Sequence, residues 1–156
     1  MNRKEVTQTL SQLLEQHINP KNDPRVYWAR EVTFNYGSQG QKRVDYMKFE
    51  PLNNSVSGLE HGDFICYEIK SCVQDFKSSH GHNFFGDINY YVMPYEVFME
   101  VKKEIDYYVG VYCPDSGKLR CVKQAHRHNR EYSALQMLFM MFRSANRDRL
   151  KGEAKE

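Results

Sequence analysis

Glu68 and Lys70 are charged residues in a segment, Phe64–Ser71, whose other members are mostly apolar. Side chains alternate between the two faces of a strand, so residues two apart project from the same face. Charge is unfavourable in such surroundings unless it has a partner. Two interpretations follow: a structural ion pair at the end of a strand, or a site that uses the carboxylate and the ammonium group for chemistry.

Asp45 offers a second carboxylate. It lies in an earlier strand-like segment, Arg43–Leu52, and in an antiparallel meander that strand would be adjacent to the Glu68 strand. Two hard oxygen ligands suit Mg²⁺ or Mn²⁺. A lysine beside the cation could orient water and offset negative charge on a phosphorus under attack. Asp45, Glu68 and Lys70 are therefore a minimal set for metal-dependent hydrolysis of a phosphodiester.

The segments that must position these residues alternate between helical and extended patterns. Apolar residues at helical spacing predict a first helix: Val6, Leu10, Leu13, Leu14 and Ile18. The meander then comprises three extended segments: Val26–Tyr36, Arg43–Leu52 and Asp63–Ser71. The later elements are expected to be a helix over Cys72–Ser79, a strand over Asn89–Met93, a helix over Tyr95–Ile105, a hairpin of Tyr107–Cys113 with Lys118–Lys123, and a helix over Glu131–Leu150. This order predicts an α/β fold with a mixed sheet flanked by helices.

The chain has 156 residues, and we expect one domain over residues 1–151 with a flexible tail at 152–156. The last predicted helix would bury an apolar stripe of Leu135, Leu138, Phe139 and Phe142. No apolar run approaches the ~18 residues of a membrane span, and the N-terminus is too polar for a signal peptide. The four cysteines are too irregularly spaced for a disulfide framework. These features predict a soluble, cytoplasmic protein with no membrane association.

Asp45, a linker of 22 residues, and Glu68-Ile69-Lys70 resemble the D…(D/E)-x-K signature of the PD-(D/E)XK nuclease superfamily. The predicted element order also matches the αβββαβ core of that superfamily, the restriction-endonuclease-like fold. Further segments are similar to its MmcB-type DNA-repair branch, and the resemblance covers roughly Arg43 to Ala125: Tyr67–Ser71, Gln74–Lys77, Asp87, Tyr90–Pro94, Val109–Val111, Gly117–Leu119 and Lys123–Ala125. Val44 stands where the superfamily name has proline.

The resemblance implies a metal-dependent DNA nuclease, active in DNA repair, recombination or the processing of mobile-element or phage DNA. It implies Asp45, Glu68 and the backbone carbonyl of Ile69 as ligands of Mg²⁺ or Mn²⁺, and Lys70 as the catalytic lysine. An acid from the first helix sometimes completes such sites, and Glu5 and Glu15 are available. Small nucleases of this type often act as dimers, which makes a homodimer compatible with the resemblance.

Two other functions stay open. The superfamily includes members that have lost catalysis, so the same fold could serve as a non-catalytic DNA-binding module. The protein could also be a structural or interaction protein in which Glu68 and Lys70 form a plain ion pair. Metal-dependent cleavage of DNA would separate the first function from both alternatives, and DNA binding would separate the alternatives from each other.

The residues after Lys70 have a structural and a functional interpretation. Ser71-Cys72-Val73-Gln74 has the S-x-x-Q pattern of a capping box, with Ser71 as the cap and Gln74 reaching back. Asp75 suits the first turn of the helix. Ser71, Gln74, Asp75 and Asp87 could also support the metal site. His80-Gly81-His82-Asn83 resembles an HNH nuclease motif, but the surrounding ββα pattern is missing, which favours a loop beside the Glu68 strand.

Positive charge is concentrated late in the chain. Five cations and no acid lie between Ser116 and Arg130: Lys118, Arg120, Lys123, Arg127 and Arg130. Such a stripe could bind the phosphate backbone of DNA by releasing counterions. The alternative is a solvated basic face without a ligand.

Overall fold

The computed structural model describes residues 1–155, with the side chains of residues 1–154. The predicted first helix and meander are confirmed: α1 (Arg3–Ile18) is followed by β1 (Tyr27–Phe34), β2 (Lys42–Glu50) and β3 (Asp63–Ile69). The three strands pair antiparallel in the order of the sequence. A short helix, α2 (Val56–Glu60), lies in the connection between β2 and β3.

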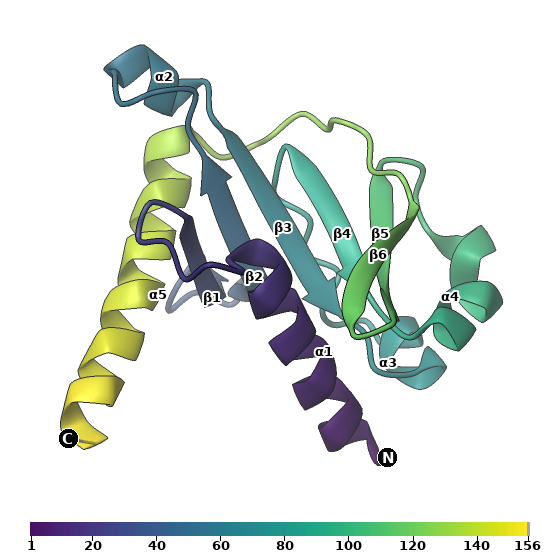
Figure 1. Ribbon diagram of the computed structural model, residues 1–156. Helices are drawn as coiled ribbons and strands as arrows, with labels where there is room; N and C mark the ends of the chain where they lie inside the picture. Colours follow the sequence, from purple (N-terminus) through teal and green to yellow (C-terminus); the bar gives the residue numbers. More distant parts are fainter. Residues whose placement is uncertain (156) are drawn as a thin grey trace.

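The second half of the chain extends the same sheet to six strands in the order β1-β2-β3-β4-β5-β6. After α3 (Val73–Lys77), β4 (Ile88–Val92) pairs parallel to β3. Helix α4 (Tyr95–Val101) and the 3₁₀ turn η1 (Lys102–Glu104) lead to β5 (Val109–Asp115), which is parallel to β4, and β6 (Lys118–Lys123) closes the edge antiparallel. The sheet is therefore mixed, as predicted, with β3 and β4 at its centre (Figure 1).

Helices cover both faces of the sheet. Because side chains alternate along a strand, β3 packs against helices on both faces. Ile65, Tyr67 and Ile69 pack with α1 on one face. Phe64 and Cys66 point to the other face, where they pack with α5 (Ala134–Lys155). Next to that cluster on the second face, α3 and α4 cover side chains of β4 and β5. A strand covered on both faces must be almost wholly apolar, and Glu68 interrupts this pattern.

Helix α5 differs from its prediction at both ends. It begins at Ala134 and not at Glu131, because Ser133 and Gln136 form reciprocal hydrogen bonds: the Gln136 amide N–H donates to Ser133 Oγ (3.2 Å) and the Ser133 N–H donates to Gln136 Oε1 (2.9 Å). It also continues through Gly152 to Lys155, beyond the predicted end at Leu150. Glu156 lies outside the described residues.

The buried face of α5 is not the one predicted. Met137, Met141 and Ser144 face the sheet, and Leu138 is only partly buried. Leu135, Phe139 and Phe142 are 79%, 58% and 68% exposed. The helix has two apolar stripes of similar spacing, and contact with β1 selects the methionine stripe. Among the described residues, no helix is long and apolar enough to cross a membrane, and the four cysteines are free thiols.

Candidate active site

Glu68 is a fully buried carboxylate on the central strand, with an exposed fraction of 0%. Within the described part of the chain, neither of its carboxylate oxygens has a hydrogen-bond partner. Burial, and after it the nearby Asp45 carboxylate, raises the pKa of Glu68 to about 9. Buried polar atoms in native proteins are almost always satisfied, so this orphaned carboxylate requires an explanation.

Asp45 lies where β2 and β3 separate. The ladder between these strands ends at the pair Tyr46–Tyr67. One residue further on, Asp45 Oδ2 accepts a hydrogen bond from the backbone N–H of Ile69 at 2.8 Å. The strand on the other side is also distorted, because Glu31 adopts a positive φ of 51°. Burial raises the pKa of Asp45, although the Ile69 N–H opposes that shift.

Lys70 follows β3 and is only 2% exposed. Its Nζ donates to the carbonyl oxygen of His80 at 2.8 Å and more weakly to that of Asp75 at 3.5 Å. Burial lowers the pKa of this lysine. Across the described residues, no ion pair within 4.0 Å joins Lys70 to Glu68. The two charged groups therefore do not form the plain ion pair that was one interpretation of the sequence.

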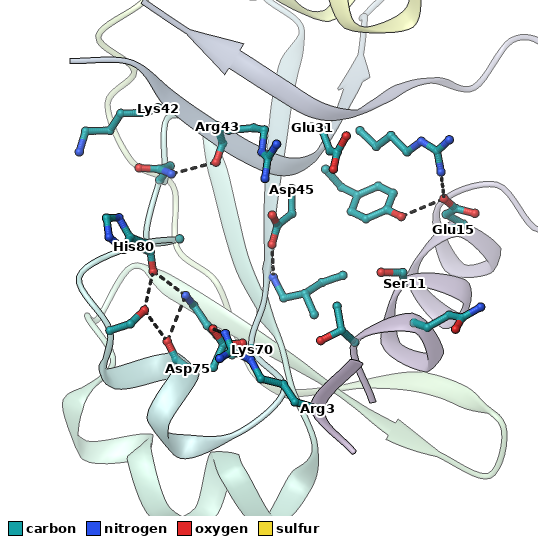
Figure 2. A pocket seen from close by; sticks show the side chains of 18 of the residues that line it. Arg3, Ser11, Glu15, Glu31, Lys42, Arg43, Asp45, Lys70, Asp75 and His80 are labelled. Carbon is teal, nitrogen blue, oxygen red and sulfur yellow. Dashed lines mark hydrogen bonds and ion pairs between the residues drawn. The ribbon is translucent and has the colours of Figure 1, made fainter. Parts of the chain in front are cut away.

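A cleft of about 1240 Å³ opens beside these residues (Figure 2). Asp45, Ile69 and Lys70 lie on its wall. Helix α1 contributes polar side chains to the opposite side: Thr7, Gln8, Ser11, Gln12 and Glu15. The loop between α3 and β4 closes a third side with residues 78–81 and Asn83. A polar cleft of this size can admit an extended polar ligand to Asp45 and Lys70.

Glu15 is the first-helix acid that reaches the cleft. It accepts a hydrogen bond from the Tyr46 hydroxyl at 2.8 Å and lies 3.7 Å from the Arg30 guanidinium. Glu5 instead forms a capping box with Asn2 at the start of α1. The structure thus separates the two candidates, which the sequence did not.

The four residues predicted to support the site have different environments. Asp75 Oδ2 accepts hydrogen bonds from the Ser71 N–H (3.0 Å) and hydroxyl (3.2 Å), so Asp75 and not Gln74 reaches back to Ser71. Gln74 is exposed, and Cys72 is the N-cap of α3 without a side-chain cap bond. The predicted capping box is therefore wrong, because the aspartate binds both Ser71 donors. Asp75 also lines the cleft.

Asp87 lies away from Glu68 and Lys70. Its carboxylate accepts the backbone N–H of Phe64, near the opposite end of β3, at 2.9 Å. It also binds the Arg130 guanidinium at 3.2 Å. Asp87 therefore fixes the start of β3 and does not line the cleft.

The late cationic stripe is mostly engaged in contacts within the chain. Arg127 forms a bidentate pair with Asp63 (2.8 Å for both bonds), and Arg130 binds Asp87 and stacks over Phe64. The ammonium group of Lys123 donates to three backbone carbonyls, those of Asp106, Tyr107 and Val109. Arg120 lies 3.6 Å from Asp115. Lys118 begins the edge strand β6. These contacts favour a structural role for the stripe over phosphate binding.

Other cations line the cleft, and they were not among the residues predicted from the sequence. Lys42 and Arg43 on β2 are exposed cleft residues, and within the described residues neither forms an ion pair. Arg43 extends toward Asp45 in Figure 2, and its charge acts to lower the pKa of Asp45. The available signal was the alternation of strand residues: Arg43 lies two positions before Asp45, so the two side chains project from the same face.

Comparison with known proteins yields one structural likeness. No family model matches the chain, and no curated protein matches it. Among solved structures, the chain is similar to the SPO1766 protein of unknown function from Silicibacter pomeroyi, with a TM-score of 0.63 and 16% identity over 96% of this chain and 90% of that one. At this identity the likeness shows the α/β fold alone.

Proposed function

We propose that the protein is a metal-dependent deoxyribonuclease of the PD-(D/E)XK type, acting in DNA repair, recombination or the processing of mobile-element or phage DNA. The observation that carries the proposal is the buried Glu68 carboxylate, whose two oxygens have no partner among the described residues. Asp45 and Lys70 converge on it where β2 and β3 separate. The element order α1-β1-β2-β3-α3-β4 also supports a restriction-endonuclease-like core.

The residues present fit a divalent cation. A carboxylate buried without a donor is stabilised by a bound cation, and a second carboxylate beside it suits the oxygen ligands that Mg²⁺ and Mn²⁺ prefer. Within the part of the chain that the structure describes, no group of three or more His, Cys, Asp and Glu side chains could hold a metal. The ion would thus have two side-chain ligands, Asp45 and Glu68, and the backbone carbonyl of Ile69 and water would complete its coordination. A bound Mg²⁺ supplies positive charge to the phosphate and to the attacking water.

The remaining groups have distinct roles. Lys70 presents a positive charge at the cleft wall, where it would stabilise negative charge that develops on the phosphate oxygens. Arg43, beside Asp45, would bind the same phosphate or its neighbour through its planar guanidinium. Lys42 would contact the backbone further along the cleft. DNA would therefore bind across the cleft and not along the Lys118–Arg130 stripe.

A non-catalytic DNA-binding module is the second candidate, and one observation favours it. The Glu68 carboxylate is fully buried, and the backbone of Gly81 covers it: a Cβ on Gly81 would lie 3.4 Å from Glu68 Oε2. A site closed in this way could have lost its metal and kept its DNA-binding cleft. Burial raises the pKa of Glu68 whether or not the site binds a metal, so this pKa does not discriminate between the two candidates.

Cleavage assays separate the candidates. Labelled single-stranded and duplex DNA are incubated with the protein in Mg²⁺, in Mn²⁺ and in EDTA, beside a Glu68→Gln variant prepared identically to exclude contaminating nucleases. We expect metal-dependent cleavage that the variant and EDTA both abolish. Binding without cleavage in either metal would support the non-catalytic module. Equal cleavage by wild type and Glu68→Gln would show that Glu68 is not an active-site residue.

A further inference from the structure

The loop between α3 and β4 contains His82, whose ring is bound at both nitrogens. Nε2 lies 2.8 Å from the carbonyl oxygen of Ser78, and Nδ1 lies 2.6 Å from the hydroxyl oxygen of Tyr91. A carbonyl only accepts, so the hydrogen-bond pattern assigns the proton to Nε2 and makes Nδ1 the acceptor of the Tyr91 hydroxyl. Neither nitrogen is left to take a proton from water. This arrangement argues against a general base of the HNH type.

Residues 78–83, here called the strap, are tied to the two strands that flank β3. His82 binds Tyr91 on β4, and Tyr91 is the register partner of Glu68. On the other side, the Asn83 side-chain amide donates to the carbonyl oxygen of Arg43 on β2 at 2.9 Å. The strap therefore crosses the sheet over the end of β3, between its two attachments.

The backbone of the strap contacts the charged residues beneath it. The carbonyl oxygen of His80 accepts the hydrogen bond from Lys70 Nζ at 2.8 Å. Gly81 has a φ of +74°, and a Cβ at this position would lie 2.6 Å from Lys70 Nζ. Glycine is favoured there because it adopts positive φ freely and has no side chain to displace the Lys70 amine. The strap thus supplies the shorter of the two hydrogen bonds that hold the Lys70 amine.

We infer that His82 is a positioning residue for Lys70: by binding Tyr91 and Ser78 it fixes the strap, and the strap orients the Lys70 amine through the carbonyl of His80. The catalytic consequence rests on the proposed nuclease function, whereas the positioning is independent of it. Misplacement of a catalytic group by about 1 Å can reduce a rate by ~10²-fold, so release of the strap should impair chemistry more than DNA binding.

Labelling of lysines with an acylating reagent, with the rate at each lysine followed by mass spectrometry, tests the positioning without requiring activity. In wild type we expect Lys70 to react more slowly than Lys42 on the cleft rim. His82→Phe keeps an aromatic ring but loses both hydrogen bonds, and should speed Lys70 labelling by roughly an order of magnitude, as expected for easier local opening. Lys42 should react as before. Tyr91→Phe, which removes a single hydroxyl, should produce a smaller change in the same direction.

His128→Phe is the matched control, because this histidine also packs against a tyrosine, Tyr108, with ring centroids 4.0 Å apart, but does not line the cleft. It should leave Lys70 labelling unchanged. Equal Lys70 labelling in wild type, His82→Phe and Tyr91→Phe would overturn the inference. If His82→Phe does not fold, the comparison of wild type with Tyr91→Phe decides the question.

Kinetics test whether His82 acts through Lys70. His82→Phe should lower kcat by ~10-fold or more while KM for DNA changes little, and should cause no further loss in a Lys70→Ala background. Losses that multiply in the double variant would show that His82 acts independently of Lys70, and would contradict the inference. If wild type cleaves no DNA but Lys70 labelling responds to His82→Phe, the nuclease proposal fails and the positioning by His82 stands.

Discussion

Replacement of Glu68 by glutamine should change how the stability of the protein depends on pH. The Glu68 carboxyl has an ordinary pKa of 4.5 and a folded-state pKa of about 9, mainly because of burial. Between these values the folded state binds one more proton than the unfolded state. The free energy of unfolding therefore falls as pH rises, by about 1.4 kcal/mol per pH unit for one group.

Between about pH 5.5 and about pH 8, this difference amounts to a loss on the order of 3 kcal/mol in the wild type without metal. Glutamine does not titrate, so Glu68→Gln lacks this contribution, while Asp45 and Lys70 are present in both proteins. Urea unfolding at several pH values, in EDTA, measures both slopes. Saturating Mg²⁺ should restore stability to the wild type at pH 8, because it favours the ionised carboxylate, and should do less for the variant. Parallel pH profiles for the two proteins would refute the idea that Glu68 is buried and protonated at neutral pH.

Five further substitutions test other parts of the structure. Lys70→Ala should retain stabilisation by Mg²⁺ but lose cleavage by ~10² or more; loss of the metal effect, measured by thermal melting, would instead make Lys70 necessary for metal binding. Arg43→Ala should weaken DNA binding and reduce the dependence of log affinity on log salt concentration by about one, whereas Arg127→Ala should change neither. Fluorescence anisotropy in Ca²⁺ measures the affinity and its salt dependence. The reverse result would indicate that DNA binds along the Lys118–Arg130 stripe. Gly81→Ala should cost about 1 kcal/mol of stability through its positive φ and slow cleavage, and normal activity would show that the strap tolerates a side chain. Ser133→Ala should cost about 1 kcal/mol by removing the cap of α5 and leave cleavage unchanged; no change in urea unfolding would contradict the capping role.

The strands of the meander were predictable because they depend on local features of the sequence, namely side-chain alternation and short connections. Alternation places Glu68 and Lys70 on one face, and the short connections of a meander make β2 the neighbour of β3. The contact of Asp45 with the Ile69 N–H follows from that adjacency. The separation of the two strands at this point was not predictable, because nothing in the residues around Asp45 signals the end of a ladder.

Contacts between distant residues were the part that sequence patterns could not supply. Arg127 and Arg130 belong to a run of cations without acids, but their partners Asp63 and Asp87 lie far away in the sequence. Charge counting along the chain therefore overestimated the free positive charge of that surface. On α5, two apolar stripes compete, and only packing on β1 decides that Met137 is buried.

Anomalous scattering from a crystal grown or soaked with Mn²⁺ tests the central proposal most directly, because it locates the ion without requiring activity. We predict a peak bound by Asp45 and Glu68, with Glu68 ionised and its oxygens no longer without a partner. At Mn²⁺ concentrations that support cleavage by other metal-dependent nucleases, a map with no peak at these two carboxylates would contradict the metal site. A peak elsewhere in the cleft would contradict the assignment of Glu68 as a ligand.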